Sequence, residues 1–172
     1  MKFKLANRRR ASSQNAITVL SLCLITLSSI AFAQETANSH EYSAEGETTI
    51  ETVNGLRIIT LRENVFVRQG DIELRGDVAV LEYNQSNQLQ QVRLTGSPAN
   101  FEQIASVATN TITGDSETIN YYAGTEGVVE FIGSAHFNQP GTKLSCAQIR
   151  HTIETGATSG QACSGSLSPQ NN

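Results

Sequence analysis

The chain has 172 residues, of which 38% are hydrophobic and 16% charged, and its acidic residues outnumber its basic ones by 16 to 12. Five of the basic residues precede position 11, so positions 34–172 hold seven Lys or Arg against sixteen Asp or Glu, a net charge of −9. Binding to nucleic acid depends on clustered Lys and Arg that neutralise phosphates. The composition therefore argues against nucleic acid as a partner.

The first 33 residues have the three parts of a secretory signal. Lys2, Lys4 and Arg8 to Arg10 precede an uncharged stretch with an apolar centre, which closes on Ala31-Phe32-Ala33. This layout predicts a signal peptide at 1–33 that is cleaved before Gln34. The alternative is an uncleaved anchor, but the strongly apolar part is shorter than the roughly 20 residues that span a bilayer. Cleavage would leave 139 residues, enough for one domain.

Two cysteines follow the signal, Cys146 and Cys163. An exported protein reaches an oxidising compartment, in which pairing of cysteines is expected. Their midpoint lies beside Gly156, so a hairpin that turns there would place the two residues opposite each other. We expect a structural disulfide, because the sequence has no C-x-x-C motif that would indicate a redox or metal role.

After a polar segment at 34–39, which we expect to be flexible, apolar residues recur with a period of two. Such alternation over a few residues, bounded by turn residues, predicts many short antiparallel strands of about five to seven residues and almost no helix. The predicted turns include Asn54-Gly55, Gln69-Gly70-Asp71 and Gln139-Pro140-Gly141. Residues 164–172 are low in apolar content and predict a disordered tail.

Two phrases repeat along the chain. One copy opens at Leu74-Arg75-Gly76-Asp77 and closes on Gly96-Ser97-Pro98-Ala99, and the next runs from Ile112-Thr113-Gly114-Asp115 to Gly133-Ser134-Ala135. A third, decayed copy opens at Leu144-Ser145-Cys146-Ala147. The spacing suggests stacked units, none of which buries its apolar face alone.

These phrases, with Asn64-Val65-Phe66-Val67-Arg68-Gln69-Gly70, occur in an order that resembles the periplasmic lipopolysaccharide-transport family of LptA and the OstA-like proteins. The resemblance implies an all-β fold at 40–163, an OstA-like β-jelly roll shaped as a twisted, open-ended half-pipe. It also implies a periplasmic protein that carries or bridges lipopolysaccharide from the inner to the outer membrane. The chain departs from the family pattern at Glu63, where the family has Gly, and at Cys146-Ala147, where it has Gly/Ala-Asp.

The partners implied are the lipid A acyl chains of lipopolysaccharide, the inner- and outer-membrane transport components, and further copies stacked head to tail. His40, Tyr42, Phe101, Tyr121 and Ala123 match groove positions of the family. Neighbours of the same parity complete the expected lipid-binding groove, which comprises Tyr42, Phe101, Ile119, Tyr121, Val129, Phe131 and Phe137. Each of these side chains would equally serve as plain core in a β sandwich. His40 replaces an aliphatic residue and makes the mouth of the groove more polar.

The sequence offers no catalytic constellation, so we expect no enzyme activity, no cofactor and no metal. His40, His136 and His151 lack the spacing of metal ligands. Asp77 and Asp115 occupy equivalent positions in the repeats, and we interpret them as turn residues rather than as a catalytic pair.

Two alternatives keep the fold and change the role. One is an LptC-like component of the same pathway, held at the inner membrane by an uncleaved N-terminal helix. The other is a β module with a filled core that binds proteins and no lipid.

Overall fold

The computed structural model describes residues 40–105 and 110–169. The expected signal peptide, the segment 34–39 and the last residues of the chain lie outside this part. The described residues contain no α-helix, as the sequence predicted. None of their segments is a helix long and apolar enough to cross a membrane.

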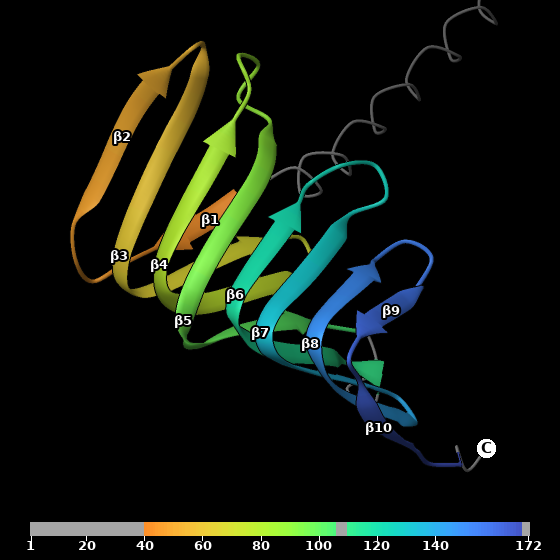
Figure 1. Ribbon diagram of the computed structural model, residues 1–172. Helices are drawn as coiled ribbons and strands as arrows, with labels where there is room; N and C mark the ends of the chain where they lie inside the picture. The colour runs from red at the N-terminus through yellow and green to blue at the C-terminus, as the bar shows by residue number, and fades with distance from the viewer. Residues whose placement is uncertain (1–39, 106–109, 170–172) are drawn as a thin grey trace, which may run out of the picture. The chain divides into compact units, whose positions relative to one another are not determined.

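Ten antiparallel strands form one continuous sheet (Figure 1). Each of the six central strands, β3 to β8, pairs with its sequence neighbour, as a meander of hairpins requires. The predicted turn at Asn54-Gly55 connects β2 to β3, and those at Gly70-Asp71 and Pro140-Gly141 connect β3 to β4 and β7 to β8. The strands are β1 (His40–Ser43), β2 (Thr48–Val53), β3 (Leu56–Gln69), β4 (Ile72–Tyr83), β5 (Leu89–Gln103), β6 (Ile112–Tyr122), β7 (Val128–Gln139), β8 (Thr142–Thr152), β9 (Thr158–Gln161) and β10 (Ser164–Leu167).

The central strands are longer than the sequence predicted, since they have 11 to 15 residues rather than about five to seven. The Gly-Asp and Gly-Ser phrases were expected to separate short strands, but they lie inside long ones. The pairing register shifts at Gly76-Asp77, Gly96-Ser97 and Gly133-Ser134, whereas Gly114-Asp115 pairs without a shift. At these shifts, two or three residues of β3, β5 or β7 lie opposite one residue of β4, β6 or β8. These are β-bulges, which bend a strand without ending it.

The bulges line up across the sheet and form a corner, made of residues 63–64, 77, 96–98, 117, 133–134 and 147. Backbone conformation explains part of the sequence there, because Gly133 has a φ of +81°. Glu63, at the position where the family has Gly, has a φ of +65°. Asp77 is thus a corner residue and Asp115 lies in β6 beside the corner, and our interpretation of both as turn residues was wrong.

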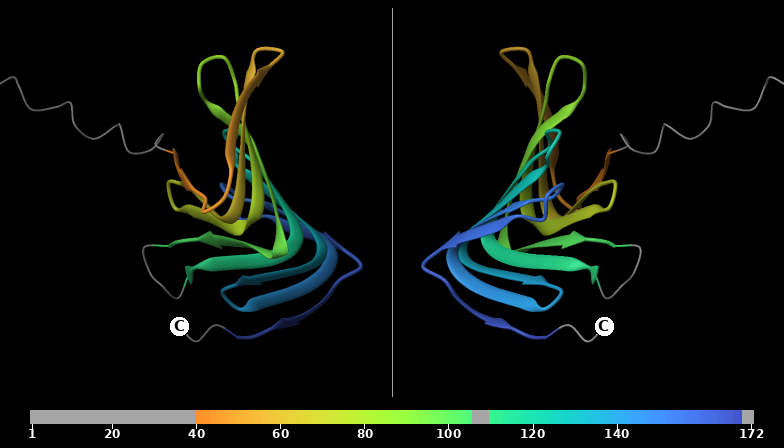
Figure 2. Two further views of the ribbon diagram at one scale, coloured as in Figure 1. Left: turned by 90° about the vertical axis from the view of Figure 1, so that its left-hand side faces the viewer. Right: turned by 90° about the vertical axis from the view of Figure 1, so that its right-hand side faces the viewer.

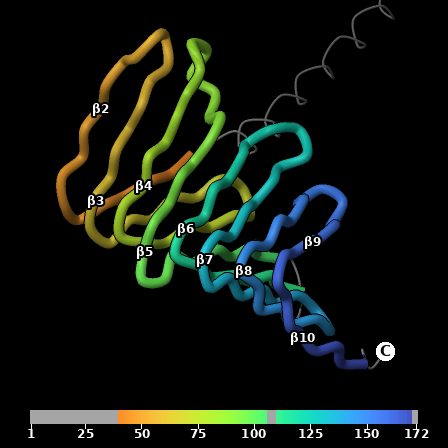
Figure 3. Tube along the Cα trace, in the orientation of Figure 1, coloured from red at the N-terminus to blue at the C-terminus, as the bar shows by residue number. Residues whose placement is uncertain are grey.

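The corner divides the sheet into two arms, as Figures 2 and 3 show. Arm A comprises residues 48–62, 78–95, 118–132 and 148–161. Arm B comprises residues 40–43, 65–76, 99–105, 110–116, 135–146 and 164–167. β1 and β2 both pair with β3, one in each arm, and β10 and β9 pair with β8 in the same way. The sheet therefore folds over itself as a twisted V, and its inner surfaces face each other.

Ser164 to Leu167 were predicted to begin a disordered tail, and this prediction was wrong, because they form β10 against β8. The reason lies in the cysteines. Cys146 and Cys163 are joined by a disulfide, and the pairs on either side of it, Gln148 with Gln161 and Ser145 with Ser164, belong to one register. The crosslink thus holds the end of the chain in place as an edge strand.

Candidate functional site

The inner face of arm A carries two rows of mostly apolar side chains. Residues paired directly on neighbouring antiparallel strands point to the same face of a sheet, so the register defines each row. The row beside the corner contains Thr48, Leu61, Ala79, Leu94, Ile119, Phe131, Ile149 and Gly160. The next row contains Ile50, Ile59, Leu81, Val92, Tyr121, Val129, His151 and Thr158.

Arm B presents a matching row from the other side of the interior. It contains Tyr42, Val67, Leu74, Phe101, Gly114, Phe137, Leu144 and Gly165. Gly114 is the one small residue in the middle of this row. A Cβ there would lie 2.5 Å from the Phe131 ring of arm A. The two arms approach each other so closely here that the second Gly-Asp phrase requires glycine at position 114.

The seven residues that the sequence placed in a lipid groove all lie in these three rows. Six of them are buried. Among the three phenylalanines in this set, Phe101 is the most exposed, at 2%. Tyr42 is 38% exposed, because it lies on the edge strand β1. Phe66 has the opposite parity and lies on the outer face, where Arg75 covers its ring at 4.5 Å.

Aromatic rings connect the two arms. Phe101 of arm B meets Phe131 of arm A at 5.6 Å between ring centroids, and Phe131 meets Phe137 of arm B at 5.8 Å. Phe137 in turn lies 4.9 Å from the ring of His151, in arm A. At the other end of the interior, His40 of arm B meets Tyr83 of arm A at 5.9 Å. Each of these pairs takes one ring from each arm.

Unlike the aromatic pairs, the hydrogen bonds of the described residues do not connect the two arms across the interior. In the part of the chain that the structure describes, they join neighbouring strands of one arm, close a turn or lie beside the corner, and none crosses the interior between the arms. Away from the corner, apolar and aromatic packing alone holds the arms together. Such packing is non-directional, so another apolar group that fits between the arms can replace it.

Two histidines are polar exceptions in this interior. His151 is completely buried, its Nδ1 lies 2.9 Å from Thr158 Oγ1, and its Nε2 has no partner. Burial lowers the pKa of His151 and also that of His40, since both lose hydration that stabilises the charged imidazolium. Neither ring is therefore suited to carry a charge at neutral pH.

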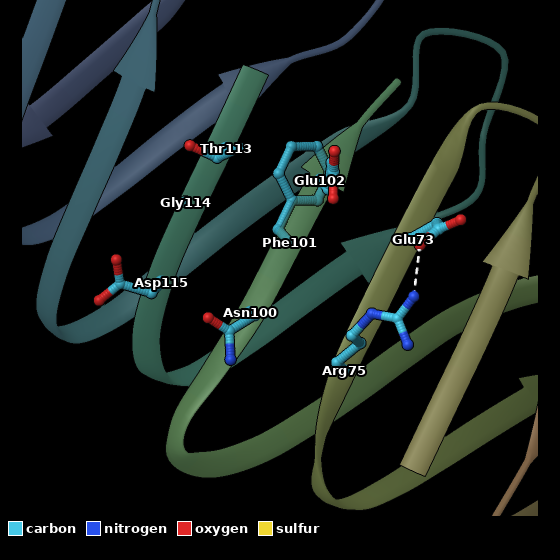
Figure 4. Close-up of a pocket in the computed structure, with 8 residues that line it drawn as sticks. All are labelled: Glu73, Arg75, Asn100, Phe101, Glu102, Thr113, Gly114 and Asp115. Atoms are coloured by element: carbon cyan, nitrogen blue, oxygen red, sulfur yellow. Dashed lines mark hydrogen bonds and ion pairs between the residues drawn. The ribbon is translucent and has the colours of Figure 1, made fainter. Parts of the chain in front are cut away.

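The outer face of arm B carries a second feature, which sequence reasoning missed. Glu73 has a side chain only 6% exposed, and both Arg68 and Arg75 pair with it. The hydrogen bond from Arg68 is the main reason that the pKa of Glu73 is lowered, and the bond from Arg75 adds to it. A shallow pocket of about 330 Å³ lies beside this cluster. Figure 4 shows the residues that line it, which are Glu73, Arg75, Asn100, Phe101, Glu102, Thr113, Gly114 and Asp115.

The sequence signal for this cluster was available. Arg68 and Glu73 flank the Gly70-Asp71 turn at equal distances, and the hairpin pairs them directly. The same reasoning would have added the inner residues of β3 to β5, such as Leu61 and Leu94, to the groove. No three His, Cys, Asp or Glu side chains of the described residues gather as metal ligands do.

Comparison with known proteins agrees with this fold. The family model described as "LptA/(LptD N-terminal domain) LPS transport protein" matches residues 44–157. Among solved structures, the chain is similar to that of LptH, "the LptA homologous periplasmic component of the conserved lipopolysaccharide transport device from Pseudomonas aeruginosa". The two are 19% identical with a TM-score of 0.64, over 78% of this chain and 99% of that one. A search of curated protein sequences gave no match.

Proposed function

The chain belongs to the LptA/LptD N-terminal-domain family of lipopolysaccharide transport proteins, and we propose that it binds lipopolysaccharide in the periplasm by taking the acyl chains between its two arms. The observation that carries the proposal is the interior itself. Three rows of mostly apolar side chains cross the strands, and no hydrogen bond spans the space between the arms in the described residues.

Acyl chains can replace the side-chain packing between the arms, because both are apolar. An acyl chain between the arms would remove contacts such as Phe101 with Phe131 and supply new apolar contacts to both rings. Each methylene taken from water contributes about 0.8 kcal/mol. Several chains on one lipid therefore supply the free energy that separating the packed side chains costs, while the hydrogen bonds of the sheet stay intact.

The N-terminal end of the interior is where we expect an acyl chain to enter. Ile50 and Tyr42 lie on the edge strands of arm A and arm B, and both belong to the inner rows. Ile50 is 61% exposed. Exposed apolar side chains at the start of a buried apolar row give an acyl chain its first contact.

Substitutions on β2 test this function with a matched control. Ile50 faces inward, whereas Val53 has the opposite parity and is 43% exposed on the other face of the same strand. A carboxylate at Ile50 would be desolvated by the incoming chain, which costs several kcal/mol. We expect Ile50→Asp to weaken loading of lipopolysaccharide in native mass spectrometry, while Val53→Asp loads as the wild type does. Equal loading of all three proteins would exclude lipid at this mouth.

The free edges of the sheet support a second part of the proposal, head-to-tail assembly into a bridge between the membranes. β1 and β2 at one end, and β9 and β10 at the other, each pair with one strand only. Unpaired strand edges can add a strand from another chain. Because positions 34–172 carry a net charge of −9, screening by salt should favour association. A strict monomer in sedimentation at high concentration and high salt would exclude the bridge.

The family assignment favours this role over the LptC-like alternative, because the matching model is that of LptA and the N-terminal domain of LptD. We assign no catalysis to the chain. Cleavage of the signal before Gln34 remains a prediction, which N-terminal sequencing of the exported protein would test.

A further inference from the structure

Beyond the apolar rows, one further row of the inner face of arm B combines polar with apolar side chains. At the tips of its strands, the register aligns His40, Gln69, Ile72 and Gln103 across four neighbouring strands. The polar members point to the inner face, because residues two apart on a strand share a face. Gln69 is two residues after the buried Val67, and Gln103 is two residues after the buried Phe101. We call His40, Gln69 and Gln103 the polar lip.

Each member of the polar lip has a buried polar atom without a partner. These atoms are His40 Nε2, Gln69 Oε1 and Gln103 Oε1. Such atoms are rare, because leaving a buried donor or acceptor unsatisfied costs free energy. Of the five unpartnered buried side-chain atoms in the described residues, three lie in this one row. Their alignment indicates a site that a ligand completes.

Neighbouring groups determine which ligand atoms fit. The Gln103 amide donates through Nε2 to Asp71 Oδ2 at 3.1 Å, so its Oε1 is left to accept a hydrogen bond. Asp71 places a negative charge beside the row. A phosphate would be repelled there, whereas a neutral hydroxyl or amide N–H would be accepted.

The opposite wall is formed by tyrosines of arm A. Tyr83 packs against His40, and burial, with a smaller effect of Asp71, raises the pKa of Tyr121 to about 12. The Tyr121 hydroxyl is therefore neutral at every physiological pH. The tyrosines that face the lip from arm A therefore add no charge at the margin of the apolar interior.

We propose that the polar lip binds the neutral hydroxyl and amide N–H groups at the junction where acyl chains join a sugar headgroup. This inference rests on the proposed function and deepens it, because it assigns separate residues to the chains and to their point of attachment. The apolar rows accept any acyl chain of suitable length. The lip distinguishes a glycolipid from a lipid whose junction offers no hydrogen-bond donor.

Two lipid probes with the same acyl chain distinguish the role of the polar lip from that of the apolar rows. N-tetradecanoylglucosamine carries an amide N–H and hydroxyls at its junction, and methyl tetradecanoate carries no donor. The variant is the double substitution Gln69→Leu with Gln103→Leu, which keeps side-chain size. The control is Gln91→Leu, a half-buried glutamine on the outer face of arm A.

We expect the double variant to bind N-tetradecanoylglucosamine about tenfold more weakly, as the loss of one or two net hydrogen bonds predicts. Its binding of methyl tetradecanoate should be unchanged, and Gln91→Leu should match the wild type with both probes. The melting temperature of the free Gln69→Leu single variant should not fall, because an apolar group replaces an unsatisfied one.

Three results with the variants would overturn the inference. One is an equal loss of both probes, and another is no loss of either. The third is a clear drop in the melting temperature of the free Gln69→Leu single variant, which would mean that Gln69 Oε1 already has a partner. If neither probe binds the wild type while lipopolysaccharide still loads, the inference fails alone. If lipopolysaccharide does not load either, the proposed function fails with it.

Discussion

The two ends of the interior differ, although one alternating pattern builds both. At the N-terminal end, the inner rows begin with Ile50 and Tyr42, which are 61% and 38% exposed. Toward the C-terminal end, Phe131 and Phe137 of β7 and Ile149 of β8 are completely buried. The edge strands beyond them end the inner rows with the small residues Thr158, Gly160 and Gly165 rather than with large apolar ones. The alternating sequence pattern therefore determines which face of the sheet a side chain lies on. Contacts from the opposite arm determine whether that side chain is buried from solvent.

The cause of the difference lies in the edge strands. At the C-terminal end, a disulfide fixes the last strands to β8, and Gly160 leaves room for it, since a Cβ there would lie 2.4 Å from Cys163 Sγ. At the N-terminal end, β1 and β2 have no crosslink in the described residues. We therefore regard the C-terminal end as the fixed end of the interior and the N-terminal end as the one that opens.

Truncation of one apolar residue at each end should give the largest contrast. Phe131→Ala should lower the free energy of unfolding by about 3–5 kcal/mol, because it leaves a cavity between the arms. Ile50→Ala should lower it by no more than about 0.5 kcal/mol, as is usual for exposed positions. Urea denaturation measures both values. Similar losses for the two variants would abolish the distinction between the ends.

The disulfide should give the next largest effect. Its removal in a Cys146→Ala, Cys163→Ala variant should cost about 3 kcal/mol, the loop-closure contribution for a crosslink of this span. The measurement is denaturation of the wild type with and without reductant, beside the variant. Labelling of two free thiols in denatured, unreduced protein from the periplasm would contradict the crosslink itself.

The pattern of residues predicted this crosslink well, because strand register depends on local pairing. Cys146 and Cys163 are equidistant from the turn beside Gly156, so a two-strand argument sufficed. The corner was not predictable in the same way. Gly76-Asp77 and Gly133-Ser134 have the composition of turns, and only pairing with neighbouring strands on both sides makes them bulges. For the groove, parity identified the inner face, but it could not show that Phe131 and Phe137 contact the opposite arm.

Acid should weaken the protein through its buried histidines. Burial lowers the pKa of His151 and His40 in the folded state, so the unfolded chain binds more protons below the ordinary histidine pKa of about 6.5. The stability from the neutral rings is complete above that pH and is lost as the pH falls through it toward the folded pKa.

We expect the free energy of unfolding to decrease between about pH 7.5 and pH 5.5, and to decrease less in His151→Leu. Ile149→Val provides the control, because it alters the buried interior without removing a titratable group and should keep the pH dependence of the wild type. The same pH dependence in His151→Leu as in the wild type would remove His151 from this explanation.

The smallest effect should come from the corner. Glu63 has a φ of +65°, and an ordinary side chain in this conformation costs about 1 kcal/mol. Glu63→Gly should therefore stabilise the protein by up to that amount. Glu117→Gly, at a corner position without a positive φ, should destabilise. Melting temperatures compare the two, and stabilisation by both would show that backbone strain is not the reason.

The central claim, that acyl chains lie between the arms, is tested most directly by photo-crosslinking in cells. A photoreactive phenylalanine analogue at Phe101 or Tyr121 faces the interior, and the same analogue at Phe66 lies on the outer face of arm B. The account predicts crosslinks to lipopolysaccharide from the first two positions and none above background from the third. Equal crosslinking from Phe66, or crosslinking from Phe66 alone, would contradict it.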